Sequence, residues 1–282
     1  MRERITLVAA ASVFLAFVGL SPEDVRNGDA TAASNLVPTS LVSTPDPEEM
    51  ELLYGAAQPE APADATVTAV DHAIDGFIRF VPRQSHPDAL RYAFQAYFSY
   101  RAKNPDKVRK PYLYFVDFGL DSRTPRGYVF DMERMSVVEG PFMVAHGRGS
   151  VLSGASTPTR FLNTNGSNAT SLGLYLAQEM YGFSGKSNGR AYRSVGLRLE
   201  GLSGRFNSAA RSRGIVVHGA PYVTAQSAGR SEGCPAMEPE LAERLIPQIA
   251  NGGLVFHFSP VDKNWMNEDP WAARGVQLAR AD

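Results

Sequence analysis

Cysteine is almost missing from this chain: its 282 residues contain one, Cys234. An intramolecular disulfide is therefore excluded, and so is a metal site built from several thiolates. A lipoprotein anchor is excluded as well, because it would need a cysteine just after the N-terminal apolar segment. A single thiol is either a buried inert side chain or a reactive one, and composition alone favours the inert form.

An excess of either charge is also missing. The 28 Lys and Arg residues nearly balance the 29 Asp and Glu residues, for a formal net charge of -1. Without a strongly basic face, nucleic acid is not expected as a partner. Hydrophobic residues make up 44% of the chain, which is enough for a proper core.

Charged residues are absent from Ile5 to Leu20, a run that follows Arg2 and Arg4. This pattern is typical of a signal peptide, or of an uncleaved anchor, over residues 1–24. Residues 25–66 are rich in Pro, Ala, Ser and Thr and predict a disordered linker. We expect a folded domain over residues 67–282 that lies outside the cytoplasm.

Within that domain, periodicity and turn residues predict a mainly β fold with a few helices. Apolar positions at helical spacing predict a helix over 86–103, and a second, short helix is expected over 238–251. The Gly-, Ser- and Asn-rich stretch 147–189 predicts long loops. Strands are expected at 112–118, 127–132, 135–145 with a break at Gly140–Pro141, 195–199, 215–217 and 254–258.

The segment with the clearest chemistry runs from Gly214 to Met237. A short apolar strand ends at His218, and the only thiol follows a glycine and precedes a proline, in Gly233-Cys234-Pro235. A nearby imidazole can take the proton of a thiol and give a thiolate–imidazolium pair, which is strongly nucleophilic. The glycine allows close approach to a substrate carbonyl, and the N–H groups of Gly233 and Cys234 could form an oxyanion hole.

The same segment resembles the active-site signature of L,D-transpeptidases of the YkuD-type fold, in which a histidine precedes Ser/Thr-x-Gly-Cys. Here His218 and Ser231-Glu232-Gly233-Cys234 match it. The chain is similar to the murein L,D-transpeptidase catalytic-domain family of Gram-negative bacteria, from about Asp88 to Pro260. Further matching blocks are VAHGRGS at 144–150, SLGLYLAQEMYG at 171–182, LRLEGL at 197–202, IVVHGAPYV at 215–223 and GRSEGCPAM at 229–237. A departure is Glu232, where the best-known members carry another residue, and this could alter the acceptor side.

This resemblance implies a YkuD-like β-sandwich or barrel that acts on peptidoglycan stem peptides, both as donor and as acceptor. Cys234 would attack the third residue of a tetrapeptide, release D-Ala and form a thioester, with His218 as base. The carbonyl of Gly219 would hold the other imidazole nitrogen. Ser231 and Arg230 would bind the donor peptide, Arg230 through a carboxylate. The resemblance further implies a periplasmic protein, free or anchored at the inner membrane, and acylation by carbapenems.

Other functions stay open at this point. An L,D-carboxypeptidase would hydrolyse the same thioester with water, and a non-catalytic wall-binding module would need neither catalytic side chain. A sortase would need an arginine shortly after the cysteine, whereas the next one is Arg244.

The remaining histidines are expected to be mainly structural. His146 lies in a second His-Gly pair and is a candidate for lining the substrate cleft, while His257 lies within an apolar strand. No cofactor is expected. A metal site of His146, His218 and Cys234 matches no zinc spacing and is not expected either. The oligomeric state is not predicted.

Overall fold

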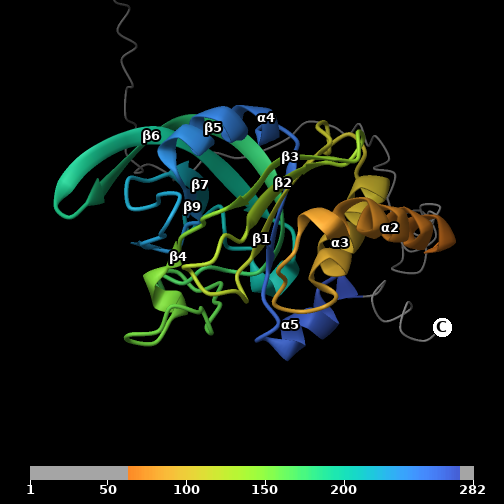
Figure 1. Ribbon diagram of the computed structural model, residues 1–282, viewed down its shortest axis with the longest axis horizontal. Coiled ribbons are helices and arrows are strands. Elements are labelled where there is room, and N and C mark those ends of the chain that lie inside the picture. Colours follow the sequence, from red (N-terminus) through yellow and green to blue (C-terminus); the bar gives the residue numbers. More distant parts are fainter. Residues whose placement is uncertain (1–62, 274–282) are drawn as a thin grey trace, which may run out of the picture. The chain divides into compact units, whose positions relative to one another are not determined.

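The structure is a computed structural model, and it describes residues 63–273 (Figure 1). This part of the chain contains four α-helices and ten strands: two helices come first, nine strands follow, and a third helix, the last strand and a fourth helix complete it. The helices are α2 (Ala63–Phe77), α3 (Ala89–Lys103), α4 (Pro239–Ile249) and α5 (Lys263–Glu268). The strands are β1 (Tyr112–Asp117), β2 (Gly127–Asp131), β3 (Ser136–Phe142), β4 (His146–Gly147), β5 (Gly173–Ser187), β6 (Arg190–Gly201), β7 (Val216–Gly219), β8 (Arg230–Ser231), β9 (Ala236–Met237) and β10 (Leu254–Phe258). Short 3₁₀ turns lie at η1 (Ile78–Phe80), η2 (Arg148–Ser150) and η3 (Gly204–Phe206).

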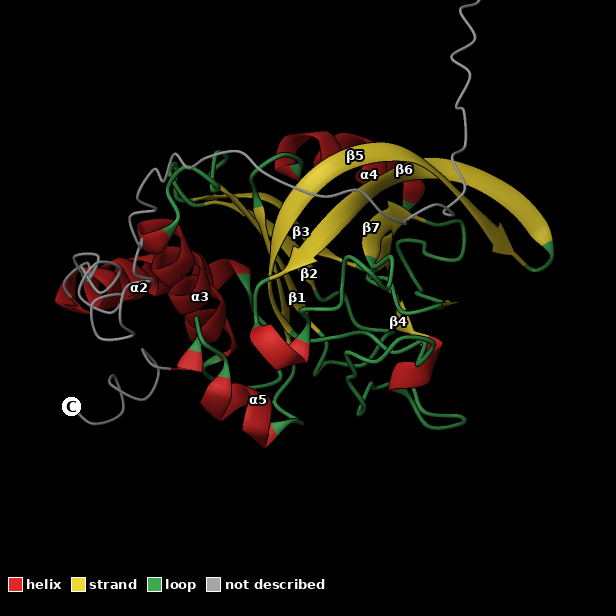
Figure 2. Ribbon diagram, turned by 180° about the vertical axis from the view of Figure 1, so that it is seen from behind, coloured by secondary structure: helices red, strands yellow, loops and turns green. Residues whose placement is uncertain are grey.

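Eight of the strands form one sheet, in the order β3-β2-β1-β10-β5-β6-β7-β9. Most neighbours are antiparallel, but β1 pairs with β10, and β7 with β9, in parallel. The two remaining strands, β4 and β8, form a separate parallel pair. The sheet curls, and the long β5–β6 hairpin arches past β7 (Figure 2).

Alternation along the central strands gives the sheet two apolar faces. In β1, Leu113 and Phe115 belong to the cluster that contains α2, α3 and α5 residues, whereas Tyr114 and Val116 belong to the cluster that contains α4 residues. Both sets are buried because helices cover both faces. Full burial of one large apolar side chain contributes about 1.5–3 kcal/mol, so both layers stabilise the sheet that carries β7.

The predicted mainly β fold is confirmed, and so are the strands at β1, β2, β7 and β10 and the helices α3 and α4. The predicted break at Gly140–Pro141 is wrong, because β3 continues through this cis peptide bond to Phe142. The helices α2 and α5 were not predicted. The first begins at Ala63 and so overlaps the last residues of the predicted linker.

The predicted loops over 147–189 are wrong for their last third. Residues 173–187 form β5, which pairs along its length with β6. The outer half of the hairpin is only partly buried, so its sequence is polar and lacks the apolar alternation of a core strand. The signal was Asn188-Gly189, which joins the two strands with both residues at positive φ, as a tight hairpin turn requires.

The predicted signal peptide or anchor (1–24) and most of the predicted linker (25–66) lie outside the described residues. Within residues 63–273, none of the helices has the length and apolar character needed to cross a membrane.

Candidate active site

The strands bring Cys234 and His218 to the same edge of the sheet. His218 lies in β7, where it is the register partner of Ala236 in β9, two residues after the cysteine. The His218 N–H also donates to the Pro235 carbonyl at 3.3 Å. On its other side Ala236 exchanges backbone hydrogen bonds with Ala145, which precedes His146. The cysteine loop is thus held between two His-Gly segments.

A serine hydroxyl shapes the loop that carries the thiol. Ser231 Oγ accepts a hydrogen bond from the Gly233 N–H at 3.2 Å and donates to the Cys234 carbonyl at 2.5 Å. Gly233 has a φ of +126°, a conformation that favours glycine. Its carbonyl accepts a hydrogen bond from Thr170 Oγ1 at 3.1 Å. Ser231 therefore acts within the loop, as a positioning residue, and the Gly233 N–H predicted for the oxyanion hole already has a partner.

The thiol of Cys234 is half-buried and lies 3.9 Å from the Gly214 carbonyl. Burial raises the pKa of this thiol above its ordinary value, and the negative charge of Glu232 raises the pKa further. The Val216 N–H and the positive charge of Arg213 lower the pKa, but by less. Arg213 is itself fixed by the Leu162 and Ala169 carbonyls at 2.8 and 2.7 Å. The thiol is thus protonated at rest, in a site that already holds one cation.

His218 is 3% exposed, and burial lowers its pKa to about 4. Its Nδ1 lies 3.0 Å from the Gly219 carbonyl. Since a carbonyl only accepts, Nδ1 carries the proton and the lone pair is on Nε2. The ring stacks on Phe183 of the β5–β6 hairpin, with centroids 4.1 Å apart and planes at 17°. The imidazole is therefore neutral, with its basic nitrogen fixed.

Burial of both side chains disfavours the expected thiolate–imidazolium pair in the absence of substrate. Burial raises the pKa of Cys234 and lowers that of His218, which favours a neutral thiol beside a neutral imidazole. In residues 63–273 no hydrogen bond joins the two side chains, and the thiol lies against Gly214 instead. Hydrogen bonds used in catalysis often tighten only when substrate is bound.

Aromatic side chains of the hairpin and of the following loop lie within electrostatic range of the thiol. The charge of a Cys234 thiolate contributes to raising the pKa values of Tyr181, Tyr192 and Tyr222. Tyr192 and Tyr222 meet edge to face, with centroids 6.4 Å apart. Together with Phe183, which stacks on His218, these half-buried rings surround the site with aromatic side chains.

The predicted substrate residues His146 and Arg230 lie together in the β4–β8 pair, where they are register partners. His146 is fully buried between two guanidinium groups: its Nδ1 lies 2.8 Å from Arg126 and its Nε2 lies 3.0 Å from Arg230. Burial and these two cations lower the pKa of His146 to about 3. Glu232 is exposed and forms an ion pair with Arg148 at 2.7 Å.

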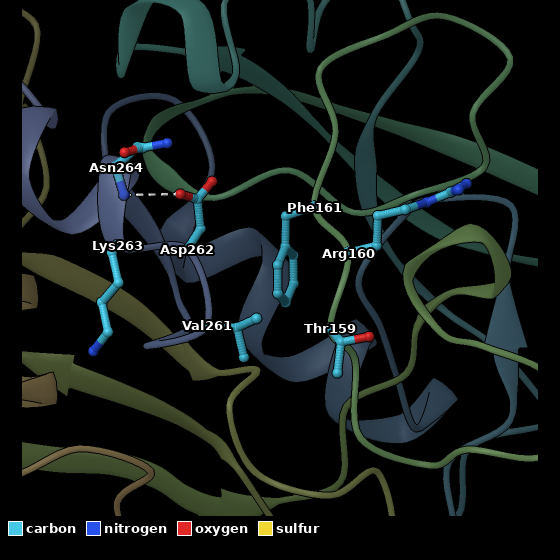
Figure 3. Close-up of a pocket in the computed structure, with 7 residues that line it drawn as sticks. All are labelled: Thr159, Arg160, Phe161, Val261, Asp262, Lys263 and Asn264. Atoms are coloured by element: carbon cyan, nitrogen blue, oxygen red, sulfur yellow. Dashed lines mark hydrogen bonds between the residues drawn. The ribbon is translucent and has the colours of Figure 1, made fainter.

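Two adjoining hollows, of about 420 and 410 Å³, lie elsewhere on the domain. Both are lined by Phe161, Asp262 and Asn264, and in the first hollow the Phe161 ring points toward Val261 (Figure 3). Neither is lined by Cys234 or His218. Among the described residues, no group of three or more His, Cys, Asp or Glu side chains could hold a metal ion.

Several residues of this site had no sequence signal. Arg126, Thr170 and Arg213 are single polar residues far from the cysteine in sequence, and only the fold brings them to its loop or to His146. Phe183 lies in the stretch predicted as loop, and recognition of the Asn188-Gly189 turn would have placed it on a strand.

A family model described as L,D-transpeptidase catalytic domain matches residues 82–258. The chain belongs to this family. The resemblance carried by the His218–Cys234 segment is thereby confirmed, together with the YkuD-type fold. No curated protein sequence matches this L,D-transpeptidase family member.

The chain also matches solved structures at low sequence identity and low TM-score. An L,D-transpeptidase from Mycobacterium smegmatis is 15% identical with a TM-score of 0.32, and the match covers 53% of this chain and 59% of that one. An L,D-transpeptidase from Stackebrandtia nassauensis is 18% identical with a TM-score of 0.33, over 61% and 68%. Bd1075 from Bdellovibrio bacteriovorus is 16% identical with a TM-score of 0.32, over 61% and 55%. The chain thus matches less than two thirds of the Mycobacterium smegmatis protein.

Proposed function

We propose that this chain is a peptidoglycan L,D-transpeptidase that joins the third residues of two stem peptides through a thioester on Cys234. The observation that supports this most directly is the fixed tautomer of His218. Its Nδ1–H is held by the Gly219 carbonyl, so Nε2 is free to accept a proton at the edge where the only thiol lies. The family of the chain gives the substrate class.

In the first half-reaction, Nε2 of His218 takes the proton of the Cys234 thiol as Sγ attacks the carbonyl carbon of the third residue. The Cys234 N–H is the nearest candidate for stabilising the oxyanion, since the Gly233 N–H is bonded to Ser231. As the tetrahedral intermediate collapses, the C–N bond breaks and the imidazolium returns its proton to the nitrogen of D-Ala. A thioester remains.

In the second half-reaction, the amine of another stem peptide attacks the thioester carbonyl and gives its proton to Nε2. The C–S bond breaks, the sulfur is reprotonated by the imidazolium, and a new amide is formed. A carboxypeptidase would use water in place of the amine. The amine would be favoured if the aromatic side chains around the site, Phe183, Tyr181, Tyr192 and Tyr222, exclude water once peptide is bound.

The test is mass spectrometry of purified tetrapeptide muropeptides incubated with the full chain. A dimer linked between third residues, with one D-Ala lost per dimer, is the expected product, and the Cys234→Ala chain should give none. Tripeptide without any dimer would assign the carboxypeptidase activity instead. Thiol labelling should show that Cys234 in the preparation is reactive. If the muropeptides then remain unchanged, both functions are contradicted.

We also propose that the protein works in the periplasm, free or held at the inner membrane by its N-terminal segment. The support is the apolar run Ile5–Leu20 after two arginines. A reporter active only outside the cytoplasm, fused after residue 66, should be active. A fusion that accumulates normally but shows no reporter activity would contradict the proposal.

A further inference from the structure

The side chain of Arg126 fixes the protonation of His146. This arginine is fully buried and uses its N–H groups as donors: Nε and Nη2 donate to the Val144 carbonyl at 3.1 and 2.9 Å, and Nη1 donates to the Leu120 carbonyl at 2.6 Å. Nη2 also lies 2.8 Å from His146 Nδ1. A guanidinium has no acceptor, so the lone pair of His146 has to face one of the two arginines. Arg126 is buried and fixed by its other bonds, whereas Arg230 is exposed and can turn away, so we assign the lone pair to Nδ1. The proton of the neutral imidazole is then on Nε2.

That proton has no acceptor. The atom that faces Nε2, at 3.0 Å, is Nη1 of Arg230, which is another donor. His146 is 0% exposed, so water cannot replace the missing acceptor at low cost. A doubly protonated imidazole would not relieve this, because it would add a third positive charge between two guanidinium groups.

Arg230 lies at the surface end of this chain of donors. Its side chain is exposed, its Nη2 donates to the Ala155 carbonyl at 2.6 Å, and it belongs to none of the ion pairs found in residues 63–273. Two donors of adjacent side chains, one buried and one exposed, therefore face each other without an acceptor between them. Both would be satisfied by one group that carries two acceptor oxygens and a negative charge.

We propose that His146 Nε2–H and the Arg230 guanidinium form a binding site for a carboxylate of the peptide substrate. One carboxylate oxygen accepts from the imidazole and the other from Arg230, after Nη1 has turned away from the ring. Arg126 is a positioning residue, because it acts by holding the tautomer. This inference rests on the proposed function, since a stem peptide carries free carboxylates beyond the bond that is cleaved. Peptides with amidated carboxylates would then bind less tightly.

The test uses the full chain with Cys234→Ala, which binds peptide without turnover, and ¹⁵N-labelled histidine. The probes are a tetrapeptide donor and the same peptide with all of its free carboxylates amidated, the C-terminal one included. We expect the His146 resonances to show a protonated Nε2 and a bare Nδ1, and the acid peptide to shift Nε2 saturably. The amidated peptide should bind about 10-fold or more weakly, as the loss of a charge-assisted pair of hydrogen bonds predicts.

Variants at the exposed arginine keep the test independent of folding. Arg230→Gln should weaken binding of the acid peptide about 10-fold or more and leave the amidated peptide unchanged, and Arg230→Lys should lie between. Arg190→Gln, at the exposed start of β6, is the matched control and should bind as the parent chain. Equal affinity for the two peptides, equal losses for both in Arg230→Gln, or a protonated Nδ1 would overturn the proposal.

Failure of this inference can be told apart from failure of the proposed function. Cross-linked dimers formed by the native chain, together with equal binding of acid and amidated peptides, would remove the carboxylate site alone. Preferential binding of the acid peptide without any acyl transfer would remove the transferase activity alone. If neither peptide binds, acetate and acetamide serve as probes. Acetate at high concentration should shift the resonance of the His146 Nε2–H, and acetamide should not. Absence of the acetate shift would also overturn the carboxylate site.

Discussion

Two His-Gly segments flank the cysteine loop, and the same dipeptide has opposite chemistry in each. His218-Gly219 in β7 and His146-Gly147 in β4 are both buried strand residues, and burial lowers the pKa of both imidazoles. The difference is the group that faces Nδ1. A carbonyl faces His218, which leaves Nε2 as a base, and a guanidinium faces His146, which leaves Nε2 as a donor.

His257 shows that the tautomer alone does not make a base. Its Nδ1 lies 3.0 Å from the Ser171 carbonyl, so it has the same tautomer as His218. Its Nε2 is buried without a partner in the described residues, between Phe118 and Tyr175. A base needs both a fixed tautomer and a neighbouring nucleophile, and only His218 has both.

The largest expected effect comes from removal of the nucleophile. Cys234→Ala should lower acyl transfer by about 10⁴-fold or more, and Cys234→Ser should also fail, because His218 cannot prepare the far more basic hydroxyl. A carbapenem should add one adduct to the native chain, as intact-protein mass would show, and no adduct to Cys234→Ala. An adduct that persists in this variant would place the nucleophile on another residue.

The comparison of the two histidines is tested next by removal of the base. His218→Ala should lower D-Ala release about 10²–10⁴-fold at neutral pH. The remaining activity should rise at alkaline pH, where the thiol, whose pKa is raised by burial, begins to ionise. In the native chain the base works when neutral, so activity should fall only as the pH approaches the His218 pKa of about 4.

The control for this series is His72→Gln, on the exposed face of α2, which should keep the native rate and pH profile. An acid limb near pH 6.5 in the native chain would show an ordinary histidine rather than a buried one. A His218→Ala chain with a near-native rate at neutral pH would contradict the assignment of the base. His146 could not take over this role, because its lone pair accepts from Arg126.

Much of the fold and the centre of the site could be predicted from the sequence. The apolar strands β1, β7 and β10 and the signature around Cys234 are local patterns, and local patterns are what a sequence displays directly. The Gly219 carbonyl is beside His218 in the chain, so its contact was implied by the resemblance alone.

The rest depends on contacts between residues far apart in the chain. Arg126 meets His146 across 20 residues, and Arg230 meets it across 84, so neither the tautomer nor its missing acceptor could be foreseen. The bonds of Ser231 within the cysteine loop have no sequence signal, because the sequence does not show which groups a hydroxyl contacts. The hairpin was missed because its outer half is too exposed to need apolar alternation.

The smallest expected effect concerns stability, and it tests whether His257 is structural. Burial lowers the pKa of His257 to about 4 from the ordinary 6.5, so the unfolded chain binds its proton more readily than the folded chain does. The free energy of unfolding should therefore fall as the pH drops from about 6.5 toward 4. Such a shift corresponds to about 3 kcal/mol for this residue when fully developed.

His257→Phe should remove that part of the acid sensitivity while it keeps the packing against Phe118 and Tyr175. The measurement is urea unfolding of the native and variant chains at pH 7 and pH 4.5. The drop in unfolding free energy between the two pH values should be smaller in the variant by about 2 kcal/mol. His146 and His218 titrate alike in both chains and cancel, and His72→Gln should show the native drop. Equal drops in the native and His257→Phe chains would mean that His257 is protonated as readily when folded as when unfolded, and its buried, neutral state would be refuted.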